Sequence, residues 1–163
     1  IAVAAAAKNE KIKFLVVGAG ARYDQIKQLA LTEKLKNISF YGHRSKLELK
    51  ELMSITDAVF ISFKAVPILS SGSPNKFFDG LAAEKIIIIN FNGWIKTLIE
   101  ENRCGFYYDP DAPMAFVEYI QPYLNSKKLL KDTQRNARTL AGKFTPTKQL
   151  ATLGFILKHF QRT

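Results

Sequence analysis

The sequence predicts an α/β protein with a Rossmann-like, open parallel sheet of five to six strands and helices on both faces. Short apolar runs alternate along the chain with longer segments of helical character, which is the pattern of consecutive β–α–β units. The run 86–89 is apolar at every position, as expected for a strand that is buried on both faces of a parallel sheet. The length of 163 residues, 47% of them hydrophobic, favours one domain over residues 1–163 with a substantial core.

Five apolar runs are predicted as strands. Most of them end in turn residues such as glycine, asparagine or an Asp-Pro pair, and the first leads directly into the turn Gly18-Ala19-Gly20. In an open parallel sheet, ligands bind at the carboxyl ends of the strands, so we expect the turns there to form one rim. The predicted strands are residues 11–17, 38–42, 57–63, 86–89 and 105–108.

Helices are predicted between and after these runs. The apolar opening 1–7 is interpreted as the end of a helix, and Ser45 is predicted to cap the helix that follows the second strand. Residues 64–72 are predicted to form a loop, and the last helical segment breaks near 142–146. The predicted helices after the opening one are 22–35, 45–54, 74–83, 93–102, 114–124 and 127 onward.

The helix after the third strand carries the main functional prediction. Ser73 is predicted as its N-cap and Pro74 as its first residue, because a serine oxygen accepts an orphan amide and proline gives up no useful donor there. One face should pack inward and another should face solvent. The inward set is Phe77, Phe78, Leu81 and Ala82, and the outward set is Asn75, Lys76 and Asp79.

The start of this helix is predicted to bind an anion. The amides of residues 73–76 would lie at the positive end of the helix dipole, and Lys76 would add a charge. Asp79 lies one turn further on, where a carboxylate could accept hydrogen bonds from ribose hydroxyls. Phosphate and ribose together indicate a nucleotide. An ordinary capped helix that binds nothing is the alternative on these residues alone.

Charge and cysteine content restrict the classes of partner. A net charge of +10 favours polyanionic partners, but the basic residues are dispersed and no nucleic-acid-binding signature occurs, so we expect no nucleic acid. The single Cys104 excludes a disulfide framework and favours a reducing, cytoplasmic compartment. Metal is not expected, and Asp109 with Asp111 is interpreted as a turn before a helix.

Other nucleotide-binding motifs do not fit. In a G-x-G-x-x-G motif that starts at Gly18, the third glycine would fall on Tyr23, and no acidic residue follows the second strand, so NAD is disfavoured. No P-loop motif G-x-x-x-x-G-K-[ST] and no G-x-S-x-G hydrolase elbow occurs.

The succession FLVVGAGARYDQIKQLA, NISFYGH, DAVFISF, GSPNKFFDGLAAEKIII and LIEENRCGFYYDPDAP resembles the carboxyl-terminal half of a GT-B glycosyltransferase of group 1 (family 4). The variant PNKFFDGLAA is similar to bacterial enzymes of capsule and O-antigen synthesis. The resemblance implies that residues 1–163 bind the donor, a nucleotide-sugar, and that an amino-terminal acceptor domain is missing from this chain. It also implies no cofactor beyond the donor substrate.

The resemblance implies roles for named positions. Gly18, Gly20 and Arg22 would border the donor diphosphate, and the start of the central helix would hold phosphate. Asp79 stands where the family has a ribose-binding glutamate. Ser71 stands where the family has a second glutamate, which is assigned to the sugar end. The implied assignments are diphosphate at Gly18, Gly20, Arg22, Ser73, Asn75, Lys76 and Phe77, ribose at Asp79, base at His43, Arg44 and Ser45, and sugar end at Ser71 and Gly72.

The sequence therefore predicts the donor-binding half of a transferase that moves a sugar from an NDP-sugar to a glycan or lipid-linked acceptor in surface polysaccharide synthesis. Its basic charge suggests peripheral contact with an anionic membrane. Two alternatives stay open, namely a non-catalytic nucleotide-sugar binding module and another GT-B enzyme such as a nucleotide-sugar epimerase. Glu84, where the family has a helix-ending glycine, predicts either a different helix end or a strained residue costing about 1 kcal/mol or more.

Overall fold

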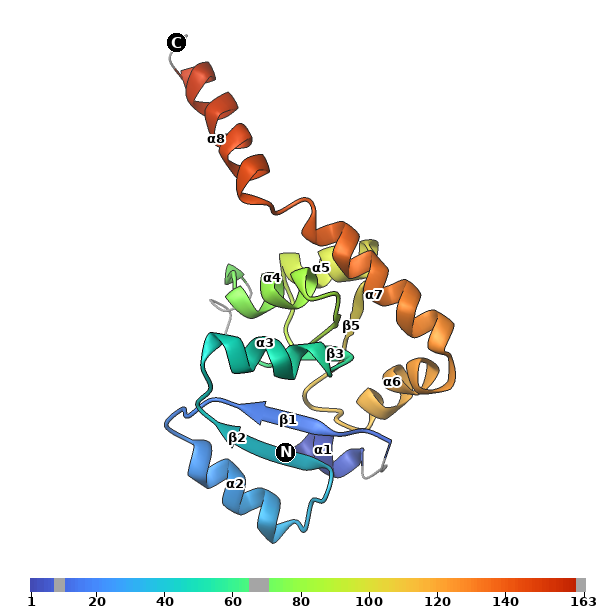
Figure 1. Cartoon of the computed structure of the whole chain (residues 1–163). Coiled ribbons are helices and arrows are strands. Elements are labelled where there is room, and N and C mark those ends of the chain that lie inside the picture. The colour runs from blue at the N-terminus through green and yellow to red at the C-terminus, as the bar shows by residue number, and fades with distance from the viewer. Residues whose placement is uncertain (8–10, 65–70, 161–163) are drawn as a thin grey trace. The chain divides into compact units, whose positions relative to one another are not determined.

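The computed structural model describes residues 1–7, 11–64 and 71–160. Strands and helices alternate along the chain, and the long helices come last (Figure 1). Most of the predicted loop 64–72 lies outside the described residues. The elements are α1 Ala2–Ala6, β1 Phe14–Val17, α2 Tyr23–Thr32, β2 Ile38–Gly42, α3 Lys46–Ser54, β3 Ala58–Ile61, α4 Asn75–Ala82, β4 Ile86–Ile89, α5 Trp94–Glu101, β5 Gly105–Tyr107, α6 Ala115–Asn125, α7 Lys127–Ala141 and α8 Pro146–Phe160.

The predicted α/β class is confirmed, and the strand pairs β1–β2 and β3–β4 are parallel. The described strands form two ladders, β1–β2 and β3–β4–β5, where the sequence predicted one sheet of five to six strands. Apolar patterning shows that a strand has buried faces, but it does not show which strand is its neighbour. The pairing therefore could not be predicted from the runs alone.

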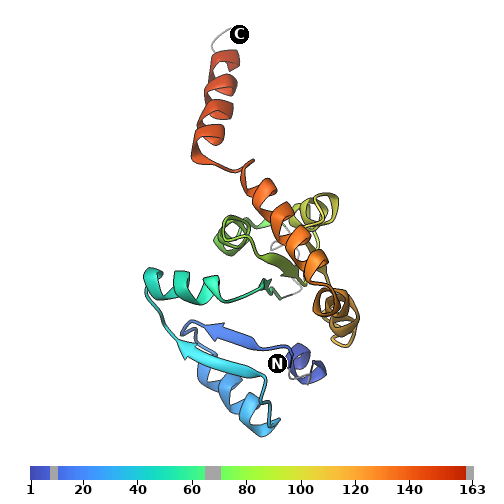
Figure 2. The same cartoon turned by 45° about the vertical axis from the view of Figure 1, so that its right-hand side comes forward.

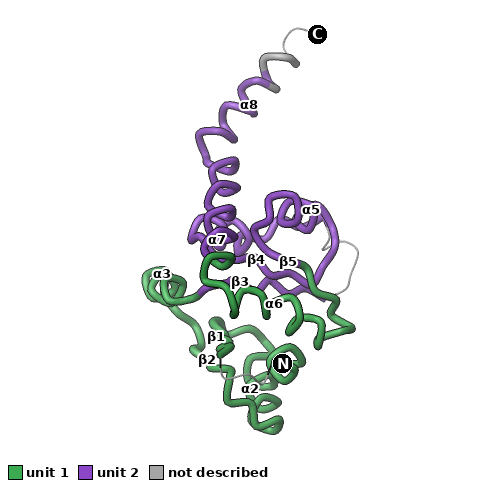
Figure 3. Tube along the Cα trace, turned by 90° about the vertical axis from the view of Figure 1, so that its right-hand side faces the viewer, with its two compact units in different colours: residues 1–56, 107–130 green, residues 57–106, 131–163 purple. Residues whose placement is uncertain are grey.

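The described chain divides into two compact units, each built from two segments (Figure 3). Unit 1 consists of residues 1–56 and 107–130, and unit 2 consists of residues 57–106 and 131–163. No helix in the described ranges is long and apolar enough to cross a bilayer.

In unit 1, α2 lies along the β1–β2 pair (Figures 1 and 2). The Tyr23 ring meets Phe40 of β2 edge-on, with centroids 5.8 Å apart. The buried Asn37 side chain joins α1 to β2, because its Nδ2 donates to the carbonyls of Ala4 at 2.9 Å and Ala7 at 2.6 Å. A buried amide with both hydrogens bonded fixes the residues that precede β2.

In unit 2, the core is the strand β4, whose four isoleucines are all buried. Two glycines allow neighbouring backbone to approach it. A Cβ on Gly80 of α4 would lie 2.8 Å from Ile87 Cδ1, and a Cβ on Gly105 would meet the Ile87 carbonyl oxygen. The core of unit 2 therefore depends on two positions where no side chain fits.

Three side chains of α7 donate hydrogen bonds to backbone carbonyls elsewhere in unit 2. Gln134 Nε2 donates to the Asp57 carbonyl at 3.1 Å. Asn136 Nδ2 donates to the Arg103 carbonyl at 3.1 Å, and Arg138 Nη1 donates to the Ala82 carbonyl at 3.0 Å. The three carbonyls lie just before β3, just after α5 and at the last residue of α4.

Three helices are followed by a charged residue in the left-handed conformation, as in the Schellman motif that often ends a helix. The residues are Lys34 after α2 at φ 52°, Glu84 after α4 at φ 57° and Arg103 after α5 at φ 49°. At Glu84 the motif is complete, because Glu84 N donates to the Leu81 carbonyl and Lys85 N donates to the Gly80 carbonyl. The helix therefore ends where the family glycine would end it, and the strain of a non-glycine residue is tolerated.

Candidate functional site

The start of α4 differs by one residue from the prediction. Pro74, with ψ at 130°, is the N-cap, and the helix begins at Asn75, so the prediction that Ser73 caps the helix and that Pro74 opens it is wrong. The extended ψ keeps proline outside the helix, and the cap residue has no side chain that could accept an amide hydrogen. The helix start therefore has no side-chain cap.

The amides in the first turn of α4 differ in whether they have a hydrogen-bond acceptor within the turn. The Phe77 amide donates to the Pro74 carbonyl at 2.9 Å, and the Phe77 side chain is fully buried. The amides of Asn75 and Lys76 have no acceptor within the helix, because they belong to its first residues, and they lie at the positive end of the helix dipole. Of the residues predicted to contact phosphate in this helix, Asn75 and Lys76 are exposed, whereas Phe77 is buried and its amide is bonded within the turn.

The outward face of α4, consisting of Asn75, Lys76 and Asp79, is exposed at all three positions, as the 3.6-residue period predicted. On the inward face Phe77 and Leu81 are buried and Phe78 is half-buried. The prediction that Ala82 packs inward is wrong, because Gly80 takes that place against β3 and β4. The outward face offers a cation one turn before a carboxylate.

The residues before α4 are bonded to the segment that follows β4. Trp94 Nε1 donates to the Gly72 carbonyl at 3.1 Å. Asn90 accepts from the Phe63 amide at 2.8 Å through Oδ1 and donates to the Phe63 carbonyl at 3.0 Å through Nδ2. Ser71 is exposed and Gly72 is half-buried. The sequence analysis did not identify Trp94 or Asn90, although both follow the carboxyl end of a predicted strand, where ligand sites form.

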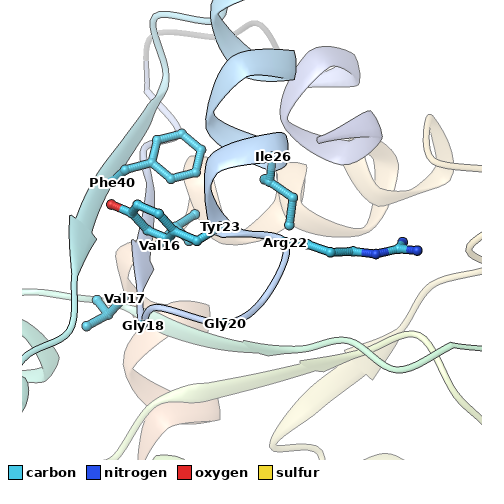
Figure 4. Close-up of a pocket in the computed structure, with 8 residues that line it drawn as sticks. All are labelled: Val16, Val17, Gly18, Gly20, Arg22, Tyr23, Ile26 and Phe40. Carbon is cyan, nitrogen blue, oxygen red and sulfur yellow. The ribbon is translucent and has the colours of Figure 1, made fainter.

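The predicted glycine turn lies in unit 1. Gly18 has φ at 136°, and its amide donates to the Gly42 carbonyl at 2.7 Å, which joins the ends of β1 and β2. The turn borders a cavity of about 180 Å³ (Figure 4). Tyr23 and Phe40 lie together on one side of it, and the exposed Arg22 side chain extends away from these rings. The cavity is mainly apolar, and its lining includes Val16, Gly18, Gly20, Arg22, Tyr23 and Phe40.

The residues predicted near the base are exposed, and two of them, Arg44 and Ser45, are bonded to Glu48 within unit 1. Ser45 forms a capping box with Glu48, in which Ser45 Oγ accepts from the Glu48 amide at 3.3 Å and Glu48 Oε2 accepts from the Ser45 amide at 2.8 Å. The prediction that Ser45 caps this helix is confirmed. These hydrogen bonds hold the pKa of Glu48 below its usual value. Arg44 borders a second cavity of about 360 Å³ and pairs with Glu48 at 3.5 Å.

The predicted binding residues thus fall into two sets, one in each unit. Unit 1 holds the set around the glycine turn and unit 2 holds the set around α4. Within the described ranges, no three histidine, cysteine, aspartate or glutamate side chains gather as metal ligands would. Asp109 and Asp111 form the predicted turn, because Asp109 Oδ1 accepts from the Asp111 amide at 2.9 Å.

A family model described as "Glycosyl transferases group 1" matches residues 1–140. Over 115 residues the chain is 26% identical to the protein named "Probable glycosyltransferase WbjE" from Pseudomonas aeruginosa. The aligned residues make up 69% of this chain and 28% of that protein. The chain therefore spans less than a third of this relative's length.

Solved structures of two other proteins have the same fold. A mutant of S. aureus TarM, in complex with fondaparinux, alpha-GlcNAc-glycerol and UDP, matches with a TM-score of 0.76 at 15% identity, over 96% of this chain and 31% of that chain. Anabaena Alr3699/HepE, in complex with UDP-glucose, matches with a TM-score of 0.71 at 18% identity, over 87% of this chain and 39% of that chain. At these identities the likeness concerns the fold.

Proposed function

Because the chain belongs to the group 1 glycosyl transferases, we propose that it is the donor-binding part of a glycosyltransferase and that α4 holds the diphosphate of a nucleotide-sugar. The observation that carries this proposal is the exposed start of α4 within a chain of this family. Asn75 and Lys76 are exposed at the positive end of the helix dipole, where the first amides of a helix have no intrahelical acceptor. Asp79 presents its carboxylate one turn further on, where it would accept hydrogen bonds from ribose.

The chemistry that we propose is transfer of a glycosyl group from an NDP-sugar to a hydroxyl of a glycan or lipid-linked acceptor. The bond between the anomeric carbon and the diphosphate oxygen breaks, and a bond to the acceptor oxygen forms. Charge develops on the leaving diphosphate, so fixed amide dipoles and a lysine at that oxygen would lower the barrier. The nucleotide-sugar is the substrate, and the proposal names no further cofactor. The acceptor would bind to a part of the protein outside this chain.

The nature of the relatives supports the choice of donor. TarM was solved with UDP and HepE with UDP-glucose. We therefore propose a uridine or guanosine diphosphate sugar as the class to test first. The similarity of PNKFFDGLAA to enzymes of capsule and O-antigen synthesis supports a surface polysaccharide as the product.

Calorimetric titration with UDP and with GDP tests this proposal. We expect saturable binding of one of them, and the variant D79N should weaken it about tenfold, because a hydrogen bond to an exposed charged acceptor contributes roughly 1.5 kcal/mol, the low end of the range for charged groups. The matched control is D132N, which changes another exposed carboxylate of unit 2 on α7. The absence of saturable binding of any nucleoside diphosphate would overturn the proposal. Equal losses in D79N and D132N would remove Asp79 from the site.

The set in unit 1 is a separate part of the proposal. The Arg22 guanidinium is exposed beside the glycine turn, where it would interact with the diphosphate as the family resemblance implies. We expect R22A to weaken nucleotide binding, with K27A on the exposed surface of α2 as its control. Unchanged affinity in R22A would limit the proposed site to α4.

A non-catalytic nucleotide-sugar binding module is the second candidate, because Ser71 replaces an acidic residue that the family assigns to the sugar end. Transfer assays on the intact natural protein separate the two candidates, since both predict nucleotide binding but only the enzyme releases the diphosphate in an acceptor-dependent way. Peripheral membrane contact through the basic charge is a further proposal for the same protein. Sedimentation with anionic vesicles, compared with neutral ones, tests it.

A further inference from the structure

The indole of Trp94 connects the start of α5 to the residues that lead into α4. Its Nε1 donates to the Gly72 carbonyl at 3.1 Å. The ring packs edge-on against Phe77, with centroids 5.8 Å apart, and lies tilted against Phe78 at 6.5 Å. Since Phe77 is fully buried, the indole is held by the same cluster that anchors the first turn of α4.

The backbone before Trp94 places the indole in this position. Gly93 is the N-cap of α5 and has φ at 120°, a conformation that side chains rarely allow. It follows the fully buried strand β4. The indole is thus attached to the most deeply buried strand of unit 2 through a short turn of defined geometry.

This connection matters because the start of α4 lacks the usual device for fixing the entering chain. Its N-cap is Pro74, which has no side-chain acceptor and no amide hydrogen. The direction in which the first-turn amides point therefore depends on how the residues before Pro74 are held. One such contact is the bond from the Trp94 indole to the Gly72 carbonyl.

We propose that Trp94 is a positioning residue for the nucleotide site: its indole N–H holds Gly72 so that the amides of Asn75 and Lys76 face the phosphate. This inference rests on the proposed function. Asn90 acts in parallel at another point, because both its amide atoms bond to the backbone of Phe63. Two side chains that follow β4 thus fix the backbone at positions 63 and 72.

The variant W94F tests the inference because phenylalanine keeps an aromatic ring and removes the N–H donor. We expect nucleoside diphosphate binding to weaken about three- to tenfold, the worth of one hydrogen bond, while the melting temperature changes by only a few degrees. The matched control is F144L, which removes a ring from the same cluster without touching Gly72. F144L should lower the melting temperature and leave the affinity within about twofold.

Amide hydrogen exchange supplies a second readout that does not require the nucleotide. In the free protein, W94F should accelerate exchange at the Phe77 amide, whose bond to the Pro74 carbonyl closes the first turn of α4, and F144L should do so less. Unchanged exchange at this amide in W94F would overturn the inference even if the nucleotide binds. Binding by W94F equal to that of wild type would overturn it as well.

Calorimetry on wild type and W94F separates failure of this inference from failure of the proposed function. Trp94 is the single tryptophan of the sequence, so the emission of wild type reports on the surroundings of this indole when nucleotide is added. If calorimetry shows that wild type and W94F bind with equal affinity, the positioning role is wrong while the proposed function holds. If calorimetry shows no binding, the proposed function fails and this inference with it.

Discussion

The central strand of unit 2 and the first strand of unit 1 differ in how deeply they are buried. All four residues of β4 are buried, whereas all four residues of β1 are only half-buried. The inner residues of unit 2 are fixed by close packing of apolar side chains against backbone. Unit 1 also contains polar contacts that fix its backbone, such as the bonds of the Asn37 amide and the capping box at Ser45. The comparison indicates that a change of side-chain volume should damage unit 2 more than unit 1.

The largest expected effect is steric and falls on unit 2. In G105A the new Cβ would collide with the Ile87 carbonyl, so β5 could not keep its place beside β4. We expect a loss of about 3 kcal/mol or more in the free energy of unfolding, measured by chemical denaturation. The matched control is G154A on α8, where nothing lies within 4 Å of the new Cβ. Equal stabilities of the two variants would contradict the packing that we describe for unit 2.

The next effect is a loss of stability at alkaline pH, and it also concerns unit 2. Burial raises the pKa of the Cys104 thiol to about 11 from an ordinary value of 9.0. The stability that this thiol contributes is therefore complete below pH 9 and is lost as pH rises through 11, by roughly 2 to 3 kcal/mol. Burial lowers the pKa of Lys85, which has the opposite sign, so wild type must be compared with C104A, in which Lys85 is unchanged. The stability difference between them should shrink between pH 9 and 11; a constant difference would contradict the burial of Cys104.

A smaller effect on stability concerns the left-handed residue that follows a helix in each unit. Lys34 in unit 1 and Glu84 in unit 2 both occupy the left-handed region, which costs a non-glycine residue about 1 kcal/mol or more. We expect K34G to stabilise the protein by about 1 kcal/mol. E84G should gain less, because it also loses the exposed ion pair between Glu84 and Arg138 at 3.7 Å. Thermal melts of the two variants measure this, and destabilisation in both would refute the strain.

The smallest effect is a loss of stability at acidic pH, and it concerns unit 1. Hydrogen bonds from Ser45 lower the pKa of Glu48, so its contribution to stability is present above the ordinary pKa of 4.5 and is lost as pH falls through the lower folded value. The protection factors of the α3 amides, which compare observed with intrinsic exchange, should therefore be higher at neutral pH than in acid. E48Q should show the lower protection already at neutral pH. Identical exchange in E48Q and wild type at neutral pH would show that the carboxylate adds nothing to the cap.

Sequence reasoning succeeded where residue type alone determines the local structure. The run Ile86–Ile89 could only be a buried strand, and Ser45 with Glu48 three residues later defines a capping box. The Asp109 turn follows from a short side chain that bonds its own backbone. The order of such local motifs was also enough to indicate the family.

Sequence reasoning failed where the deciding partner is backbone or lies far along the chain. Ser73 is an excellent cap by type, yet the extended Pro74 takes that position. The inward place of Gly80 depends on how closely α4 approaches β3 and β4, and that approach is set by packing. The bond from Trp94 ends on a carbonyl of Gly72, and every residue has such a carbonyl, so residue type could not reveal it.

The helix α7 has a consequence for how the protein is made. Its side chains Gln134, Asn136 and Arg138 bond to backbone carbonyls of unit 2 that were synthesised 77, 33 and 56 residues earlier. Each unit also consists of two segments, and the second segment of unit 1 interrupts unit 2. On the ribosome, unit 2 must therefore wait with open turns until α7 emerges, and a nascent chain stalled before that helix would expose them to chaperones and proteases.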